Sequence, residues 1–284
     1  MALRWCILGG AGLLGRAFGR RLPEATRLTH AACDITRPAE VTAALERERP
    51  DVVVLCAAMT AVDACEGDQP RAQALNAVAP GDVARAADRL GARLVHLSTD
   101  YVFDGRSRAA WREDDATGPL SVYGATKLEG ERAVRGVLGD DALIVRAQWL
   151  YGQGGPDFVD AILSAARQRS VLRVVEDQRG APTQVDALAD AIVRLVGCDA
   201  RGTVHFAASG ACNRAEWARA ILSAAGLNVQ VEPCTTAEFP RPAARPANSV
   251  FDLSRYIALT GDTPADWSAE VMEFVARSAR APLQ

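Results

Sequence analysis

The 32 basic residues of this 284-residue chain comprise a single lysine, Lys127, and 31 arginines. Histidine is scarce as well, because His30, His96 and His205 are the only three and lie far apart. The seven cysteines form no C-x-x-C pair, and several lie within apolar runs. These absences argue against a metal site and a disulfide framework, and they favour free thiols in a reducing compartment.

The sequence also lacks an excess of either charge and any long apolar segment. The formal net charge is -3, which gives no indication of a nucleic-acid or anionic-membrane partner. No apolar run approaches the roughly 18 residues of a membrane span, and the N-terminal residues enter a glycine-rich turn without a cleavable signal. We therefore expect a cytoplasmic protein, and its 49% hydrophobic content excludes a disordered chain.

The only lysine follows Tyr123 by four residues, within a helix predicted over 121–136. Both side chains would project from one face of that helix. A phenol with a pKa near 10 is a poor acid at neutral pH, and we expect the neighbouring ammonium to lower that pKa. The compact amine of Lys127 can also bind ribose hydroxyls, a role for which a planar guanidinium has the wrong shape.

Apolar runs alternate with helical patterns through residue 147. Strands are predicted at 4–8, 26–29, 51–58, 92–98 and 142–147. Helices are predicted from the glycine turn to about residue 22, and at about 38–49, 70–90 and 121–136. This alternation predicts an α/β fold with a doubly wound parallel sheet of the Rossmann type.

The pattern changes after residue 149. A Gly/Pro-rich loop is followed by a helix at 157–169, a strand at 172–175, a helix at 185–197 and a strand at 203–207 that could rejoin the main sheet. We expect a second, smaller, discontinuous α/β domain that closes a cleft at the carboxyl ends of the strands. The predicted division is residues 1–150 plus about 177–206 for the first domain, and about 151–176 plus 207–284 for the second.

Glycines 9, 10, 12 and 15 follow the first predicted strand and open a helix. Glycine lets a backbone approach a pyrophosphate closely, and a helix N-terminus supplies free N–H groups and a positive dipole. The three-residue spacing of Gly9, Gly12 and Gly15 is typical of short-chain dehydrogenases. A turn needed only for packing is the alternative, and the strand–turn–helix context weakens it.

The end of the second strand lacks the carboxylate that usually binds the ribose in NAD-selective sites, and Asp34 comes only later. Without that acid a 2′-phosphate is not repelled, and Arg16, Arg20 or Arg21 lies near enough in sequence to pair with one. We therefore expect NADPH as the cofactor, with NADH possible. The alternative is that these arginines solvate an exposed helix face.

The strand at 92–98 ends in Ser98, Thr99, Asp100 and Tyr101. Hydroxyls at the carboxyl end of a parallel strand point into the crevice where ligands of such sheets bind. Capping by Ser98 and Thr99 and core packing of Tyr101 are the alternatives. Together with the tyrosine and lysine, these residues favour an active site.

Several segments, which occur along the chain in the same order as in a known family, support a resemblance to that family. They are GGAGLLG (9–15), DIT (34–36), AAMTAVDACE (57–66), LSTDYVFDG (97–105), YGATKLEGE (123–131), RAQWLYG (146–152), DQRGAPT (177–183) and RPANSVFD (245–252). The chain resembles the dTDP-4-dehydrorhamnose reductase family of the extended short-chain dehydrogenase/reductase superfamily. The resemblance implies reduction of the C4 ketone of dTDP-4-dehydro-6-deoxy-L-mannose to dTDP-L-rhamnose, with NADPH or NADH, by a dinucleotide-binding and a sugar-nucleotide-binding domain.

The resemblance also implies residue roles. Tyr123 would donate the proton, and Thr99 would adjust the hydrogen bonding at the site. Lys127 would tune Tyr123 and bind the ribose. The implied cofactor-binding residues are Gly9, Gly12, Leu13, Leu14, Gly15, Asp34, Ala57, Ala58, Thr60 and Lys127. The implied substrate-binding residues are Asp100, Tyr101 and Trp149, with Arg245 at the nucleotide end.

The chain departs from the family at several positions. Met59 stands where relatives often have an aromatic residue, and Thr29 stands where they often have an acid, which bears on NADH use. Some relatives bind magnesium between subunits through acidic side chains, but residues 16–18 offer none, so we expect no metal. A homodimer is possible.

Other functions remain open at this point. The superfamily's tyrosine and lysine also serve epimerases and dehydratases, which retain and recycle their cofactor. A reductase of another nucleotide-linked 4-ketosugar and a non-catalytic regulatory subunit of the same fold are further alternatives, because fold alone does not fix function.

Overall fold

The computed structural model describes residues 2–280, with the backbone alone for 278–280, and six parallel strands form the central sheet of this part. The strands are β1 (Trp5–Leu8), β2 (Thr26–Leu28), β3 (Val52–Leu55), β4 (Arg93–Thr99), β5 (Leu143–Ala147) and β10 (Gly202–Phe206). Their order is β10-β5-β4-β3-β1-β2, and every neighbouring pair is parallel. The predicted doubly wound sheet is confirmed, including the strand expected to rejoin it.

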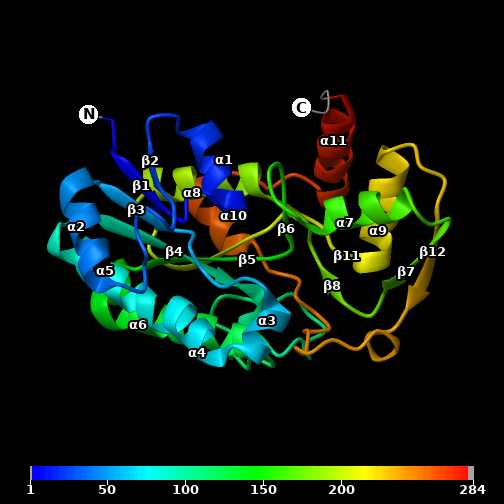
Figure 1. The fold of residues 1–284 in the computed structure, drawn as a ribbon, viewed down its shortest axis with the longest axis horizontal. Coiled ribbons are helices and arrows are strands. Elements are labelled where there is room, and N and C mark those ends of the chain that lie inside the picture. The colour runs from blue at the N-terminus through cyan, green and yellow to red at the C-terminus, as the bar shows by residue number, and fades with distance from the viewer. Residues whose placement is uncertain (1, 281–284) are drawn as a thin grey trace.

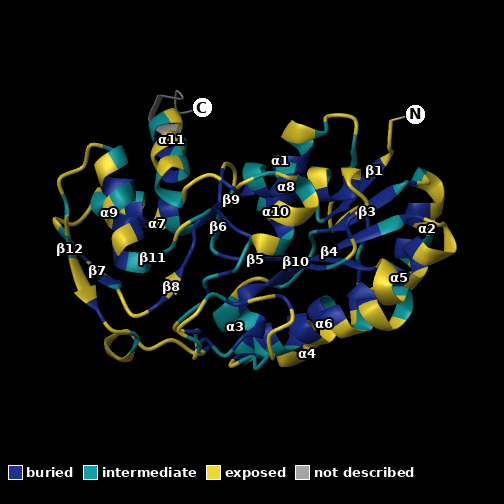
Figure 2. Cartoon of the chain, turned by 180° about the vertical axis from the view of Figure 1, so that it is seen from behind, coloured by how far each residue is buried: buried dark blue, intermediate teal, exposed yellow. Residues whose placement is uncertain are grey.

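Helices cover both faces of this sheet (Figure 1). On one face lie α1 (Leu13–Arg21), α8 (Val185–Gly197) and α10 (Ser254–Thr260), and on the other lie α2 (Pro38–Glu48), α5 (Ala79–Arg89) and α6 (Val122–Leu138). Successive strand residues alternate between the two cores, so the strands are buried on both sides (Figure 2). That double burial explains why they are continuous apolar runs in the sequence.

A separate core lies around the fully buried Trp217. Its elements are α7 (Phe158–Ala166), β7 (Val171–Val175), α9 (Arg214–Ala224), β12 (Gln230–Cys234) and α11 (Trp267–Arg280). The helices α7, α9 and α11 lie together to one side of the central sheet (Figures 1 and 2). Two short strand pairs lie nearby: β6 (Leu150–Tyr151) with β9 (Thr183–Gln184), and β8 (Arg179–Gly180) with β11 (Cys212–Asn213). The α10 helix, although it falls within 207–284, packs on the central sheet instead.

The segment predicted as one helix over 70–90 has an irregular middle. It consists of α4 (Gln69–Ala72), a π-helical turn η1 (Gln73–Val78) and α5. The π turn places the buried Asn76 so that its side chain accepts from the Met59 N–H at 2.8 Å and donates to the Met59 carbonyl at 3.0 Å. π turns often occur at functional sites, and this one fixes the loop after β3.

Some elements differ from the sequence-based expectations. The strand predicted over 51–58 ends at Leu55, and α3 (Val62–Gly67) follows. The helices α9, α10 and α11 were not predicted. Short 3₁₀ turns occur at η2 (Asp100–Val102), η3 (Gly139–Asp141) and η4 (Thr236–Glu238). No helix in the described part of the chain is both long and apolar enough to cross a membrane.

Candidate active site

A cleft of about 730 Å³ opens where β1, β3, β4 and β5 end. Ligands of open α/β sheets bind at this edge, next to the point where the strand order reverses, here between β1 and β3. The cleft brings together most of the predicted site residues. They are Gly9, Gly12, Leu13, Leu14, Gly15, Ala57, Ala58, Thr60, Thr99, Asp100, Tyr101, Tyr123, Lys127 and Trp149. Asp34 and Arg245 do not line it.

The glycine turn forms one end of the cleft. Gly9 has φ +90°, and a Cβ atom on Gly15 would lie 2.4 Å from the Gly9 carbonyl oxygen, so both positions require glycine. No side chain caps the N-terminus of α1, which leaves the N–H groups of its first turn for a ligand. The turn therefore fits the pyrophosphate of a dinucleotide.

The loop after β3 and the segment after β2 line the adjoining wall. Ala57, Ala58 and Thr60 face the cleft, with the loop held by Asn76. The Asp34 carboxylate instead accepts hydrogen bonds from the Thr36 hydroxyl at 2.7 Å and the Thr36 N–H at 3.0 Å, and these bonds lower its pKa. The cleft at this point is lined by His30, Cys33 and Ile35.

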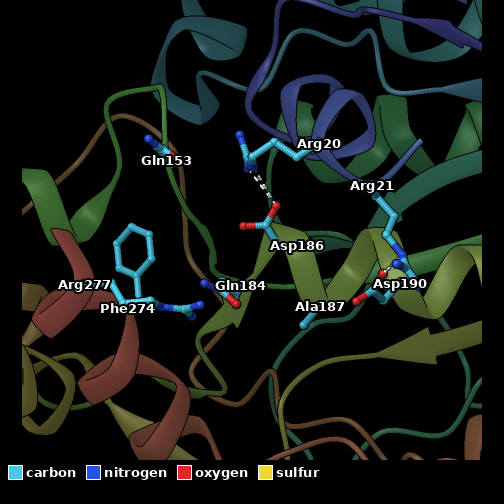
Figure 3. Close-up of a pocket in the computed structure, with 9 residues that line it drawn as sticks. All are labelled: Arg20, Arg21, Gln153, Gln184, Asp186, Ala187, Asp190, Phe274 and Arg277. Atoms are coloured by element: carbon cyan, nitrogen blue, oxygen red, sulfur yellow. Dashed lines mark hydrogen bonds and ion pairs between the residues drawn. The ribbon is translucent and has the colours of Figure 1, made fainter. Parts of the chain in front are cut away.

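The three arginines considered for a 2′-phosphate have other partners. Arg20 pairs with Asp186 at 2.8 Å and Arg21 pairs with Asp190, in a separate pocket of about 660 Å³ beside α1 and α8 (Figure 3). Arg16 donates to the carbonyls of Ala11 and Gly154. None of the three lines the active-site cleft, so the hypothesis that one of them binds the cofactor phosphate is not supported by their contacts.

Tyr123 and Lys127 lie on successive turns of α6, and both face the cleft. Ser121 caps this helix by accepting from the Gly124 N–H at 3.2 Å. The Lys127 side chain is only 4% exposed, and its Nζ donates to the Leu97 carbonyl of β4 at 2.5 Å. Burial lowers the pKa of Lys127 to about 8, although the Glu131 carboxylate acts in the opposite direction.

The expectation that Lys127 lowers the pKa of Tyr123 is wrong for this structure. Burial raises the pKa of the phenol above its usual value, and the hydrogen bond with Thr99 offsets this only in part. Electrostatic repulsion from Asp100 and Tyr101 raises the pKa of the phenol further. The Lys127 amine is directed at a strand carbonyl instead, so Tyr123 holds its proton firmly.

β4 ends at Thr99, and the η2 turn follows. The Thr99 hydroxyl accepts from the Tyr101 N–H at 3.3 Å and bonds to the Asp100 carboxylate at 3.0 Å. Asp100 is 2% exposed, and burial raises its pKa to about 6. The Tyr101 ring contacts the Tyr123 ring edge to face, with centroids 5.4 Å apart. The Ser98 hydroxyl donates to Glu131, whereas Thr99 hydrogen-bonds with the Tyr123 phenol.

Aromatic residues line another part of the cleft. Trp149 has φ +48°, a strained conformation for a bulky residue, and its indole stacks on Trp217 with centroids 5.8 Å apart. Phe158, Arg214 and Trp217 from the second core also line this part. The sequence analysis missed these three, although the N-x-x-E capping box of Asn213 and Glu216 indicated the start of α9.

Arg245 lies beside the cleft. Its guanidinium makes a bidentate ion pair with Asp63, at 2.6 and 2.9 Å, and it bonds to the Tyr101 hydroxyl. The charge of Arg245 is therefore already compensated within the protein, and its observed contact is with Tyr101.

The glycine turn lies at the ligand-binding edge of a doubly wound sheet, and the same cleft contains a tyrosine and a lysine one helical turn apart. This combination is typical of the short-chain dehydrogenase/reductase class. Within that class, the family described as "RmlD substrate binding domain" matches residues 3–280, and the chain belongs to this family.

Curated relatives and a solved structure agree with this assignment. The chain is 40% identical to a dTDP-4-dehydrorhamnose reductase of Streptomyces griseus, over 95% of this chain and 92% of the relative. It is 42% identical to a probable dTDP-4,6-dihydroxy-2-methyloxan-3-one 4-ketoreductase of Streptomyces antibioticus, over 95% and 94%. The crystal structure of a dTDP-4-dehydrorhamnose reductase of Bacillus anthracis in complex with NADP matches with a TM-score of 0.93 and 34% identity, over 98% and 100%.

Proposed function

We propose that the protein reduces the C4 ketone of dTDP-4-dehydro-6-deoxy-L-mannose to give dTDP-L-rhamnose, using NADPH, with NADH as a possible second cofactor. The observation that carries this proposal is the meeting of the glycine turn, Thr99, Tyr123 and Lys127 in one cleft. Family membership and the NADP-bound relative support the choice of reaction and cofactor.

In the proposed mechanism the dihydronicotinamide, when bound, supplies the hydride. The first turn of α1 would hold the pyrophosphate, and Lys127 would bind ribose hydroxyls of the cofactor. Tyr123 transfers its phenolic proton to the ketone oxygen as that oxygen gains negative charge, and Thr99 orients the phenol. The raised pKa of Tyr123 keeps its proton in place until this transfer.

The substrate would occupy the part of the cleft away from the glycine turn. We assign contacts with the sugar to Asp100, Tyr101 and Trp149, which line the cleft. The division into residues 1–150 plus about 177–206 for the cofactor, and about 151–176 plus 207–284 for the sugar nucleotide, belongs to the same proposal. Arg245 would act on the nucleotide end through Tyr101, to which it is bonded.

The proposal includes a cytoplasmic location for the protein. The seven cysteines are free thiols, which supports the cytoplasm as the proposed location. A homodimer stays a prediction.

The test is an assay of NADPH oxidation with dTDP-linked 4-keto-6-deoxyhexoses of defined stereochemistry. Oxidation that depends on dTDP-4-dehydro-6-deoxy-L-mannose, with dTDP-L-rhamnose as product, is expected. A second candidate, reduction of another nucleotide-linked 4-ketosugar, is favoured by similarity to the 4-ketoreductase of Streptomyces antibioticus, and a preference for a different sugar would select it. Tightly retained cofactor without net NADPH consumption would instead indicate an epimerase and contradict both.

A further inference from the structure

Arg214 is a cationic residue in the cleft whose charge has no ion-pair partner in the part of the chain that the structure describes. It is the first residue of α9 and reaches the cleft from the second core. Among the described residues, no carboxylate forms an ion pair with its guanidinium and no group forms a hydrogen bond to it. The ionisable groups that act most strongly on its pKa are Tyr101 and Asp100, which belong to the proposed sugar site.

The guanidinium is instead held by aromatic rings. Its Cζ atom lies 3.6 Å from the centroid of the Trp149 ring, and 5.3 and 5.4 Å from those of Phe158 and Trp217. Cation–π contacts of this kind orient the planar group and leave the N–H donors at its edge for another ligand. The position of Arg214 is therefore fixed before any ligand arrives.

Arg214 is half-buried, and this makes its charge costly without a counter-ion. Burial lowers the pKa of Arg214 to about 10, so that the side chain remains charged at neutral pH. A buried charge is destabilising unless an opposite charge or hydrogen bonds compensate it. The contrast is Arg245, whose charge Asp63 already compensates. Arg214 is consequently suited to a ligand that brings negative charge into the aromatic part of the cleft.

We propose that Arg214 binds the diphosphate of the nucleotide sugar, between the sugar site at Asp100 and Tyr101 and the outer part of the cleft. This inference rests on the proposed function, because that function gives the substrate a diphosphate. The pyrophosphate of the cofactor has its own proposed site at the glycine turn, whose residues are distinct from those around Arg214. A forked guanidinium matches phosphate oxygens in a bidentate manner, which lysine cannot reproduce.

The test measures dTDP binding to the NADPH-saturated protein by calorimetry, because dTDP has the diphosphate but not the sugar. Arg214→Gln should weaken dTDP binding by about 10- to 100-fold, and Arg214→Lys by less. Binding of thymidine, which lacks phosphate, should be the same in wild type and variant. In the reductase assay the KM for the nucleotide sugar should rise while kcat changes by less than about threefold.

Arg219→Gln is the matched control, because Arg219 is an exposed arginine of the same helix. Arg214→Met keeps the length and the apolar contact with the rings, so it replaces the glutamine variant if that protein does not fold. Equal dTDP affinity in wild type and Arg214 variants would overturn the subsite alone. Failure of the wild-type protein to bind dTDP would overturn the proposed function, and the subsite with it.

Discussion

At the scale of single residues, desolvation controls the chemistry of the cleft. It lowers the pKa of Lys127 and raises the pKa values of Tyr123 and Asp100, so each group is moved toward its neutral form. Ligands that bring charge or hydrogen-bonding groups into the cleft therefore change the protonation of these residues. A protonated tyrosine is the form that a proton donor requires.

Replacing Tyr123 by phenylalanine tests the donor directly. Tyr123→Phe should lower kcat by at least about 10²-fold, because acid catalysis is lost, while NADPH binding stays nearly unchanged. Turnover is measured from NADPH oxidation and binding from cofactor fluorescence. Tyr256→Phe, which removes a phenol that donates to Asp262 away from the cleft, is the control. A turnover close to that of wild type in the Tyr123 variant would refute the assignment.

Lys127 should make NADPH binding depend on pH. Its pKa of about 8 means that the amine is protonated below that pH and loses its charge as the pH rises through it. NADPH affinity should therefore be constant below about pH 7 and fall above about pH 8. Fluorescence titrations across this range measure it. Lys127→Met should bind weakly without this pH dependence, and parallel profiles for both proteins would exclude the role of the amine.

At the scale of elements, α6 links the catalytic residues to the sheet. Glu131, one turn after Lys127, forms two hydrogen bonds of 2.8 Å with Arg146 of β5 and accepts one from Ser98 of β4. Glu131 and Arg146 are 1% and 2% exposed, so the pair is almost fully dehydrated. This pair fixes the helix against two strands whose ends line the cleft.

Breaking the buried pair should destabilise the protein strongly. Glu131→Ala leaves the Arg146 charge buried without its partner, and the free energy of unfolding should fall by about 3–5 kcal/mol. Asp51→Asn, which breaks the exposed pair with Arg4, should cost less than about 1 kcal/mol. Urea denaturation of both variants gives the comparison. Similar losses in the two would show that the buried pair is not a major link.

The strands of the central sheet could be predicted from the sequence, whereas the π turn could not. Strands such as Val52–Leu55 were predictable because burial on both faces requires an unbroken apolar run. The π turn was not, because it depends on Asn76 packing against Gly130 of α6, where a Cβ atom would lie 2.1 Å from the Asn76 carbonyl oxygen. Helices α9 and α11 flank a segment that contains five prolines, at 233, 240, 242, 246 and 264, and neither helix contains proline or glycine.

The parts of the candidate site that directly follow strand ends could be predicted from the sequence. The glycine turn and the residues after β4 follow strand ends, so topology alone brings them to one edge. Arg214 and Trp217 reach the cleft through tertiary packing of the second core, which local sequence does not encode. Asp34 was expected from the resemblance, but it is engaged by Thr36 within its own loop.

At the scale of the whole molecule, α11 joins the second core to the strands beside the cleft. Glu270 of this helix accepts a hydrogen bond from the backbone of Gln184, at the end of β9. Its carboxylate also raises the pKa of the buried Tyr151 hydroxyl in β6. Burial raises the pKa of Glu270 from its usual 4.5 to about 7.

This raised pKa makes stability depend on pH. Between about pH 4.5 and 7 the folded protein retains a proton on Glu270 that the unfolded chain has lost, so its contribution to stability falls as the pH rises. Glu270→Gln keeps a neutral acceptor for the Gln184 N–H. The variant should therefore match wild type near pH 4.5 and be more stable by about 2–3 kcal/mol above pH 7. Urea denaturation at several pH values measures the difference, with Glu273→Gln, an exposed neighbour on α11, as the control. A difference between Glu270→Gln and wild type that stays constant with pH would show that folding does not shift the pKa of Glu270, and it would contradict the prediction.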